Sequence, residues 1–421
     1  MEDTNTLPTN QPTPNQVHTP IQVPRHKPKS QGKLLMEITA MSGEYPIENI
    51  LRMMSSASYA KKVVSALIND KLIKTVSTGG LKGYRLTLKG KKTLIKDNPA
   101  RFAGFLDGTA ETNKMRTGYE RRLRLHSIAE VCTLMYFADV EIFQGVKQKI
   151  YLRDSPVAPS QPTKENSEGN TSSKVNNYAL TGNPPQNPPT IIKPCFYTSR
   201  EQKGQDDNAI RGSRAVGTLL TPTHVYAVYN TGSRESRWSK DIEQRFRVEV
   251  QNNICRKLLF SQYEGSDVGG IMIGNELETL AKYLDVKDKQ QTGFHFLSRT
   301  YQPFYYITND IYGEVQLKIL CDRGRMASLQ GTLLNKLNPP DTKYHIVHDA
   351  MAQDGIPVLF CCLLDIPRLI SFKDGVTLHN QSAQVIAFDF QAKMLKAYLG
   401  NSVQIRALNF EKIVKWLFPN G

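Results

Sequence analysis

Carboxylates that could bind a metal ion lie between residues 195 and 421. A metal-dependent nuclease needs carboxylates that converge on Mg²⁺, often with a lysine on a strand. Glu201 and Lys203 have an E-x-K spacing, and Glu243 follows them. These three are the candidate catalytic residues, with Mg²⁺ as the cofactor that the reaction would need. The segment before Glu201 lacks the acidic residue that such a site expects on a preceding strand. Further carboxylates of this region are Asp206, Asp207 and Asp267.

Other catalytic patterns are missing. A tyrosine nickase would need a His-x-His strand, whereas His345 and His348 are three residues apart. The nearby tyrosines at 301, 305, 306 and 312 are typical of aromatic packing. The chain has no G-x-x-x-x-G-K-[ST] loop, no G-x-S-x-G elbow and no C-x-x-C pair. We therefore predict no metal site and no cofactor outside the nuclease alternative, and a binding protein rather than an enzyme.

Basic side chains offer a second chemistry, the binding of phosphates. The 421 residues carry a net charge of +15, and the segment Lys33–Lys96 holds twelve Lys and Arg against four Asp and Glu. More than half of the excess thus lies in one short segment. Such a concentration indicates a nucleic-acid partner. A second group flanks "AVYNTG" and predicts either another phosphate-binding surface or solvated loop charge: Arg211, Arg214, Arg234, Arg237 and Lys240.

Three predicted helices and a hairpin must position the basic residues of Lys33–Lys96. The segments "GKLLMEITAM", "PIENILRMM" and "SASYAKKVVSALIND" have helical patterns, and Ser55 or Ser56 can cap the third. Its apolar residues recur at i, i+3, i+4 and i+7, which predicts a buried stripe of Ala60, Val63, Val64 and Leu67. The runs "LIKTVS" and "GYRLTL" predict an antiparallel hairpin with Gly79 and Gly80 at its tip.

This order of elements is that of a winged helix-turn-helix, in which the third helix enters the DNA major groove. On that helix, Ser58, Tyr59 and Lys62 would read bases. The hairpin would place Thr78, Lys82 and Arg85 along the DNA backbone. The predicted DNA-binding residues are Ser58, Tyr59, Lys61, Lys62, Thr78, Lys82, Arg85, Lys89, Lys91 and Lys92, and Lys96 extends the strip.

A longer pattern resembles the replication-relaxation family. It comprises "GYRLTLKGKKTL", "RLRLHSIAEVC", "FYTSREQK", "SRAVGTLLTPTHVYAVYNTG" and a Trp-then-Glu segment, and it spans roughly residues 33 to 250. The resemblance implies a winged-helix DNA-binding protein of plasmids and integrative elements of Gram-positive bacteria. It brings no assigned catalytic residue with it.

Composition divides the chain into five parts and predicts a multi-domain α/β protein. Residues 1–32 are proline-rich and predict a disordered arm. The winged-helix domain would cover 33–98, a helical connector 99–153, and a Pro/Ser/Asn-rich linker or long loop 154–194. Residues 195–421 alternate strand-like segments, among them "YHIVH", with helical ones, which predicts an α/β C-terminal domain with a mixed sheet.

We therefore predict a sequence-specific double-stranded DNA-binding protein of a mobile genetic element, acting in plasmid replication or conjugative transfer. Further expected partners are a second copy of the chain and replication or transfer proteins. We expect no membrane partner and a cytoplasmic location, because the longest apolar run, Val358–Leu364, cannot span a bilayer and no signal-peptide pattern is present. Two alternatives stay open: a DNA nickase or metal-dependent nuclease recruited by the winged helix, and a transcriptional regulator whose C-terminal domain dimerises or senses a ligand.

Overall fold

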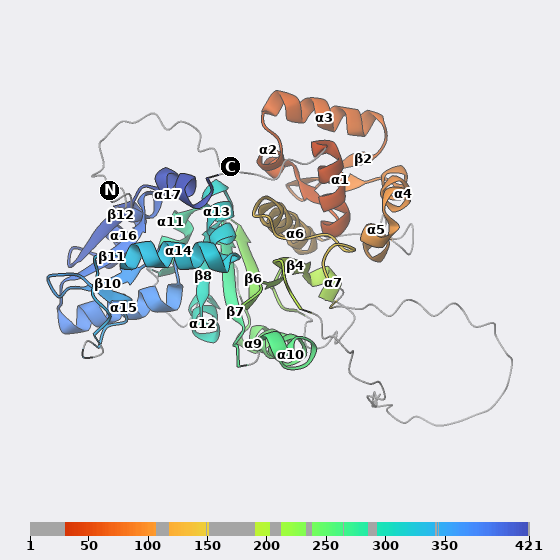
Figure 1. The fold of residues 1–421 in the computed structure, drawn as a ribbon. Helices are drawn as coiled ribbons and strands as arrows, with labels where there is room; N and C mark the ends of the chain where they lie inside the picture. Colours follow the sequence, from red (N-terminus) through yellow and green to blue (C-terminus); the bar gives the residue numbers. More distant parts are fainter. Residues whose placement is uncertain are drawn as a thin grey trace, which may run out of the picture.

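The computed structural model of the protein describes residues 30–106, 118–148, 150, 190–202, 212–232, 238–263, 265–284, 293–341, 343 and 345–419. Most of the predicted arm and of the predicted linker lies outside these residues, as do Lys203, Asp206, Asp207, Arg211, Arg234 and Arg237. Helices and three sheets make up the described part (Figure 1), so the chain has the predicted mixture of helix and sheet.

The first elements form a small unit around a three-stranded sheet. In chain order they are α1 (Gln31–Ser42), β1 (Tyr45–Pro46), the 3₁₀ turn η1 (Ile47–Asn49), α2 (Ile50–Met53), α3 (Ala57–Asn69), β2 (Ile73–Thr78) and β3 (Leu81–Leu86). The strands are antiparallel in the order β1-β3-β2. Helices α4 (Leu88–Asp97) and α5 (Pro99–Leu106) follow and pack against α1. Helix α1 begins inside the segment that we predicted as a disordered arm.

Local sequence signals account for this unit. The Ser56 hydroxyl caps α3 by accepting a hydrogen bond from the Tyr59 N–H, which confirms one of the two predicted caps. The predicted stripe faces the core, with Ala60 and Val64 buried and its other two members half-buried. At the hairpin tip Gly79 and Gly80 have φ of 60° and 79°, the positive values that a two-residue turn of this type needs.

Helix α6 (Tyr119–Phe137) lies between this unit and the rest of the molecule (Figure 1). One hydrophobic cluster joins α1, α3 and the hairpin to α6 and to one face of the next sheet. Six α6 side chains are at most 1% exposed in it: Ile128, Ala129, Val131, Cys132, Leu134 and Met135. The segment that we predicted as a connector thus holds the central helix of a shared core.

The next sheet has five strands in chain order: β4 (Cys195–Thr198), β5 (Gly217–Leu220), β6 (Val225–Gly232), β7 (Gly269–Gly274) and β8 (Phe304–Thr308). The pairs from β4 to β6 are antiparallel, and those from β6 to β8 are parallel. The intervening helical elements are α7 (Ser199–Gln202), α9 (Lys240–Val250), the π-helical segment η3 (Gln251–Leu258), α10 (Phe260–Tyr263), α11 (Leu277–Leu284) and α12 (Gly293–Thr300). Helix α6 covers one face of the sheet, and α9 covers the other.

A four-stranded sheet completes the fold. Helices α13 (Ile311–Leu320) and α14 (Arg323–Leu334) lead to β9 (Ala350–Met351), β10 (Pro357–Phe360), α15 (Ile366–His379), β11 (Ala383–Phe388), α16 (Asp389–Leu399), β12 (Val403–Leu408) and α17 (Phe410–Leu417). The strand order is β12-β11-β10-β9, with β10 to β12 parallel. The C-terminal part therefore contains two sheets where we predicted one. The described residues of "YHIVH" lie outside the strands, so that predicted strand is wrong.

The described residues also show whether any helix could cross a membrane and where the cysteine thiols lie. Within the described ranges, no helix combines the length and apolarity needed to cross a bilayer. All six cysteines are buried and free. Burial raises the pKa of the Cys132 thiol to about 12, so this group stays protonated at neutral pH.

Candidate nucleic-acid interface

Helix α3 presents a basic, carboxylate-free face to solvent. It lies at the edge of the molecule, away from the two C-terminal sheets (Figure 1). Ser58, Lys61 and Lys62 are exposed, and Tyr59 exposes 42% of its surface. The helix contains no acidic residue. Because the apolar stripe faces the core, these four side chains lie on the remaining, exposed faces of α3, as predicted.

The hairpin exposes one predicted lysine, Lys82. Lys82 on β3 is exposed and lies directly opposite Ser77 on β2. Side chains on a strand alternate between faces. Lys82 therefore lies on the same face of the hairpin as Tyr84, which is buried against the core of the unit. Thr78 is also exposed, and its hydroxyl donates to the Ser77 carbonyl.

Helix α4 extends the basic surface only in part. Lys89, Lys92 and Lys96 are exposed and line one cavity of about 360 Å³ with Leu88 and Thr93. The Lys89 ammonium donates to the Asp70 carbonyl, 2.9 Å away, at the end of α3. Lys91 differs, because burial and the neighbouring Arg200 and Lys74 lower its pKa.

Arg85 does not join the exposed lysines. Its guanidinium forms an ion pair with Glu44, with 2.7 Å between Arg85 Nη2 and Glu44 Oε2. Arg85 and Lys82 lie on opposite faces of β3, because they are an odd number of residues apart. We predicted that Arg85 would lie along the DNA backbone. The structure instead directs it to a buried carboxylate, and we leave it out of the interface.

Glu44 is the centre of a buried polar cluster that sequence reasoning missed. Its side chain is fully buried and accepts hydrogen bonds from Arg85, from Arg122 Nε at 3.0 Å and from His126 Nε2 at 2.8 Å. Burial alone would raise the pKa of Glu44, but the three donors lower it to about 2. Gly83 makes room for the carboxylate, because a Cβ there would lie 2.3 Å from Glu44 Oε1.

Arg122 also fixes the hairpin to α6. It donates to the Thr78 carbonyl at 2.7 Å and to the Val76 carbonyl at 3.1 Å, both on β2. The hairpin tip lies against the first residue of α6, since a Cβ at Gly79 would be 3.5 Å from the Tyr119 ring. Buried charges thus set the orientation of the hairpin. The only sequence signal was the i, i+4 spacing of Arg122 and His126 in "RRLRLH".

Other buried contacts hold the unit on the five-stranded sheet. Arg52 on α2 pairs with the buried Glu314 on α13 at 2.8 Å. Glu130 on α6 accepts from Asn49 at 2.6 Å and from Asn230 on β6 at 2.7 Å. Burial raises the pKa of Glu130. Together with the shared core, these contacts orient α3 relative to both C-terminal sheets.

The candidate catalytic carboxylates are buried in separate structural networks. Glu201 pairs with the buried Lys147 at 2.7 Å and accepts from the Thr198 N–H at 2.8 Å. Glu243 is fully buried, accepts from the Ser213 hydroxyl at 2.7 Å, and has its pKa raised by burial. The described residues contain no group of three or more His, Cys, Asp or Glu side chains placed to hold a metal ion. Lys203 lies outside the described residues.

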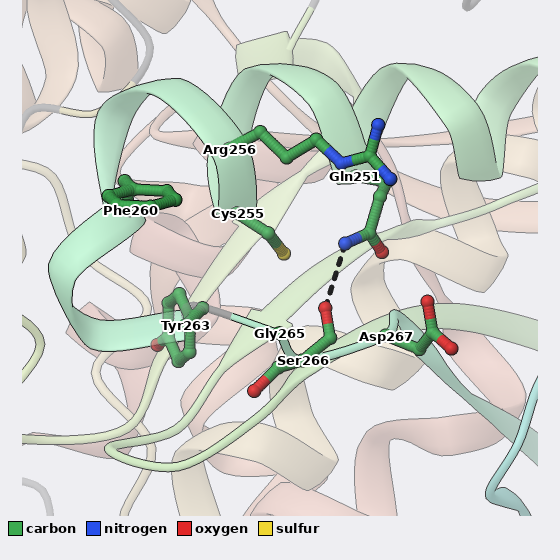
Figure 2. A pocket seen from close by; sticks show the side chains of 8 residues that line it. All are labelled: Gln251, Cys255, Arg256, Phe260, Tyr263, Gly265, Ser266 and Asp267. Carbon is green, nitrogen blue, oxygen red and sulfur yellow. Dashed lines mark hydrogen bonds between the residues drawn. The ribbon is translucent and has the colours of Figure 1, made fainter.

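A separate cavity of about 280 Å³ lies beside η3, at the end of the molecule away from α3 (Figures 1 and 2). Gln251 lines this cavity. Its side-chain amide donates to the Ser266 carbonyl at 2.7 Å and accepts from the Val268 N–H at 2.9 Å. Burial raises the pKa of the Cys255 thiol in its wall to about 11. Asp267 at its rim is exposed and lies 3.5 Å from Arg247.

Comparison with known proteins identified no relative: no family model, no curated protein and no solved structure matches this chain. The residues of the chain are therefore the basis for assigning its function.

Proposed function

We propose that this protein binds double-stranded DNA through a winged helix formed by α1 to β3. In this arrangement α3 enters the major groove, which is wide enough for a helix, and the hairpin follows the DNA backbone. The observation that carries the proposal is the set of cations on that surface. Lys61, Lys62 and Lys82 are exposed and make no hydrogen bond or ion pair within the described part of the chain.

The surrounding sequence leaves these cations uncompensated. Between Ile50 and Lys96 the only acidic residue is Asp70, at the end of α3. The two arginines of this segment, Arg52 and Arg85, are paired with buried carboxylates, so the lysines make up the exposed charge. An unpaired basic surface binds polyanions through phosphate contacts and counterion release.

Each exposed residue has a proposed role. Lys61 and Lys82 contact phosphates, which position the protein without carrying sequence information. Ser58, Tyr59 and Lys62 face the base edges and provide discrimination. Lys89 and Lys92 extend the phosphate contacts along α4. A role in plasmid replication or conjugative transfer is part of the same proposal, and its basis is the sequence pattern of residues 33 to 250 alone.

A salt titration tests the phosphate contacts. The variant Lys61→Ala/Lys62→Ala/Lys82→Ala is compared with wild type in mobility-shift titrations on a random-sequence duplex at several salt concentrations. We expect the slope of log K against log salt to fall by about 0.9 for each lost phosphate contact. The matched control is Lys393→Ala/Lys412→Ala/Lys415→Ala, which removes the same charge from exposed positions on α16 and α17. Equal slopes for the two triple variants would contradict the proposal.

Selection of bound sequences from a random duplex pool tests the reading of bases. Tyr59→Ala should weaken the consensus that wild type selects, while its salt slope on a random duplex stays within experimental error. An unchanged consensus would remove Tyr59 from the proposed reading face.

The mobile-element role has its own test. The triple lysine variant is introduced into the element that carries the gene, and copy number and transfer frequency are measured. A fall in either supports replication or transfer. If both stay unchanged while transcription of neighbouring genes changes, the transcriptional-regulator alternative is the better one.

A further inference from the structure

Two exposed histidines lie close together at the end of α15. His379 is the last residue of that helix, and His345 lies in the segment between α14 and β9. Their ring centres are 6.1 Å apart, and their ring planes differ by 28°. In Figure 1 helix α15 lies on the opposite side of the molecule from α3. Imidazole is the commonest metal ligand in proteins, so the pair brings two such ligands to one point of the surface.

The backbone beside both histidines is held in place. Ile346, next to His345, is 3% exposed and packs on α15, where a Cβ at Gly375 would lie 3.2 Å from Ile346 Cγ1. Asn380, next to His379, ends the helix in the left-handed conformation with φ of 47°. The separation of the two histidines is therefore set by packing on α15.

The ring nitrogens of both histidines are available to a ligand. Neither His345 nor His379 makes a hydrogen bond or an ion pair within the described part of the chain. His348 differs, because its Nδ1 donates to the Ile346 carbonyl at 2.6 Å and its Nε2 accepts from the Asp341 N–H at 3.1 Å. A neutral imidazole binds a metal through its unprotonated nitrogen. The exposed pair can therefore supply two ligands, whereas His348 has no nitrogen left.

The separation of the rings fits one shared ion. A zinc ion lies about 2.0 to 2.1 Å from a histidine nitrogen and hence about 3.2 Å from the ring centre. Two rings that bind the same ion have centres about 5.2 Å apart at a tetrahedral angle and about 6.4 Å apart at a linear one. The observed 6.1 Å lies between these limits. Because both side chains are exposed, either ring can turn a nitrogen towards the ion without disturbing the core.

The surroundings favour a transition-metal cation. The last turn of a helix, where His379 lies, carries partial negative charge on its carbonyl groups. Two imidazoles without a carboxylate suit copper, nickel and zinc, whereas magnesium and calcium need oxygen ligands. The described residues contain no group of three or more His, Cys, Asp or Glu side chains placed to hold a metal ion. Two ligands thus come from the pair, and water fills the other positions.

We propose that His345 and His379 form a two-histidine site for a divalent transition-metal ion, and that Cu²⁺ binds more tightly than Ni²⁺ or Zn²⁺. The ion joins the segment before β9 to the end of α15 and so stabilises this part of the fold. The site revises the expectation of no metal site, because no sequence motif links two histidines so distant in the chain. It is independent of the proposed DNA contact.

Titration calorimetry on protein without a histidine tag tests the site with Cu²⁺, Ni²⁺, Zn²⁺ and Mg²⁺ in turn. We expect the dissociation constant for Cu²⁺ to rise about tenfold or more in His345→Gln and in His379→Gln, because either change removes the chelate. Mg²⁺ should not bind to the pair. Equal Cu²⁺ affinity in wild type and in His345→Gln/His379→Gln would overturn the proposal.

A matched control separates this pair from the other histidines. His18→Gln/His26→Gln removes two histidines from residues 1–29 and should leave the affinity of the proposed site unchanged. If this variant instead abolishes all Cu²⁺ binding, the proposal is wrong.

Thermal unfolding gives a second measurement. Without metal, wild type and His345→Gln/His379→Gln should unfold within about 1 °C of each other, because the replaced side chains are exposed. Saturating Cu²⁺ should raise the unfolding temperature of wild type by about 2 °C or more and leave that of the double variant unchanged. An equal rise in both proteins would place the ion elsewhere and contradict the site.

Discussion

The surface of α3 and the hairpin uses basic residues in one way, and the cluster beneath them uses basic residues in the opposite way. On the surface, Lys61, Lys62 and Lys82 face solvent without carboxylate partners. Beneath it, Arg85 and Arg122 surround one buried glutamate. A count of positive charge treats both groups alike, yet only the first is available to a polyanion.

The difference teaches that pairing, rather than residue type, decides what a cation does in this unit. Exposed ion pairs contribute little to stability, and unpaired exposed cations contribute almost nothing. A buried ion pair is different, because removal of one partner leaves an uncompensated charge in a low dielectric. We therefore expect surface variants to change binding and cluster variants to change stability.

The largest effect should follow from loss of the shared carboxylate. Glu44→Gln removes the negative charge that Arg85, Arg122 and His126 surround. We expect the free energy of unfolding, measured with urea at neutral pH, to fall by about 3 to 5 kcal/mol. Glu48→Gln is the matched control, because Glu48 is exposed on η1, and it should change stability by less than about 0.5 kcal/mol.

The same pair of proteins gives a pH test. The pKa of Glu44 in the folded protein is about 2, below its ordinary value of 4.5. Its stabilisation is therefore complete above pH 4.5 and is lost as the pH falls towards 2. The stability difference between wild type and Glu44→Gln should be constant from neutral pH down to about 5 and shrink at lower pH. A difference that is independent of pH would show that Glu44 is not the titrating group.

Arg85 and Lys82 divide the two roles within one strand. Arg85→Ala should lower the free energy of unfolding by about 3 kcal/mol and leave the salt slope of DNA binding unchanged. Lys82→Ala should lower the slope by about 0.9 and change stability by less than about 0.5 kcal/mol. Urea unfolding and salt titrations of both variants measure the contrast. A lower salt slope of DNA binding in Arg85→Ala, measured at a temperature where the variant is folded, would show that Arg85 also contacts DNA and would contradict the division of roles.

A smaller effect should follow when the space beside the carboxylate is filled. In Gly83→Ala the new Cβ would lie 2.3 Å from Glu44 Oε1, so strand or carboxylate must shift. We expect a loss of about 1 to 3 kcal/mol in unfolding free energy. Gly331→Ala on α14 provides the control, since its Cβ would enter open space in a helix and should stabilise slightly. An unchanged free energy of unfolding in Gly83→Ala would mean that the Glu44 carboxylate can move away from the new Cβ without loss of its hydrogen bonds.

The smallest effect concerns the start of α3. Ser56→Ala removes the cap on the Tyr59 N–H and should cost about 1 kcal/mol. Ser55→Ala, at an exposed residue next to the cap, should cost less than about 0.5 kcal/mol. Thermal unfolding of the two variants makes the comparison. Equal losses would show that the cap does not limit stability.

Short-range patterns predicted the first unit well. The cap at Ser56, the stripe containing Ala60 and Val64, and the Gly79-Gly80 tip all depend on residues within a few positions of one another. The sheets of the C-terminal part were harder. We did not predict strand β12, because Gln404 and Arg406 interrupt its apolar residues. Polar residues at these positions suit a strand at the edge of a sheet, where β12 lies.

The sequence by itself determined the first and third helices and the hairpin of the first unit, and which residues of α3 face outward, because helical periodicity and turn chemistry are local. The predicted helix "PIENILRMM" is instead the end of β1, the turn η1 and the short helix α2. Only the tertiary structure decided that Arg85 is paired and that α6 is central. Those outcomes depend on Glu44 and Arg122, which are distant in the chain from the groups they affect. A buried charge finds its partner through folding of the whole core, and no local pattern records that choice.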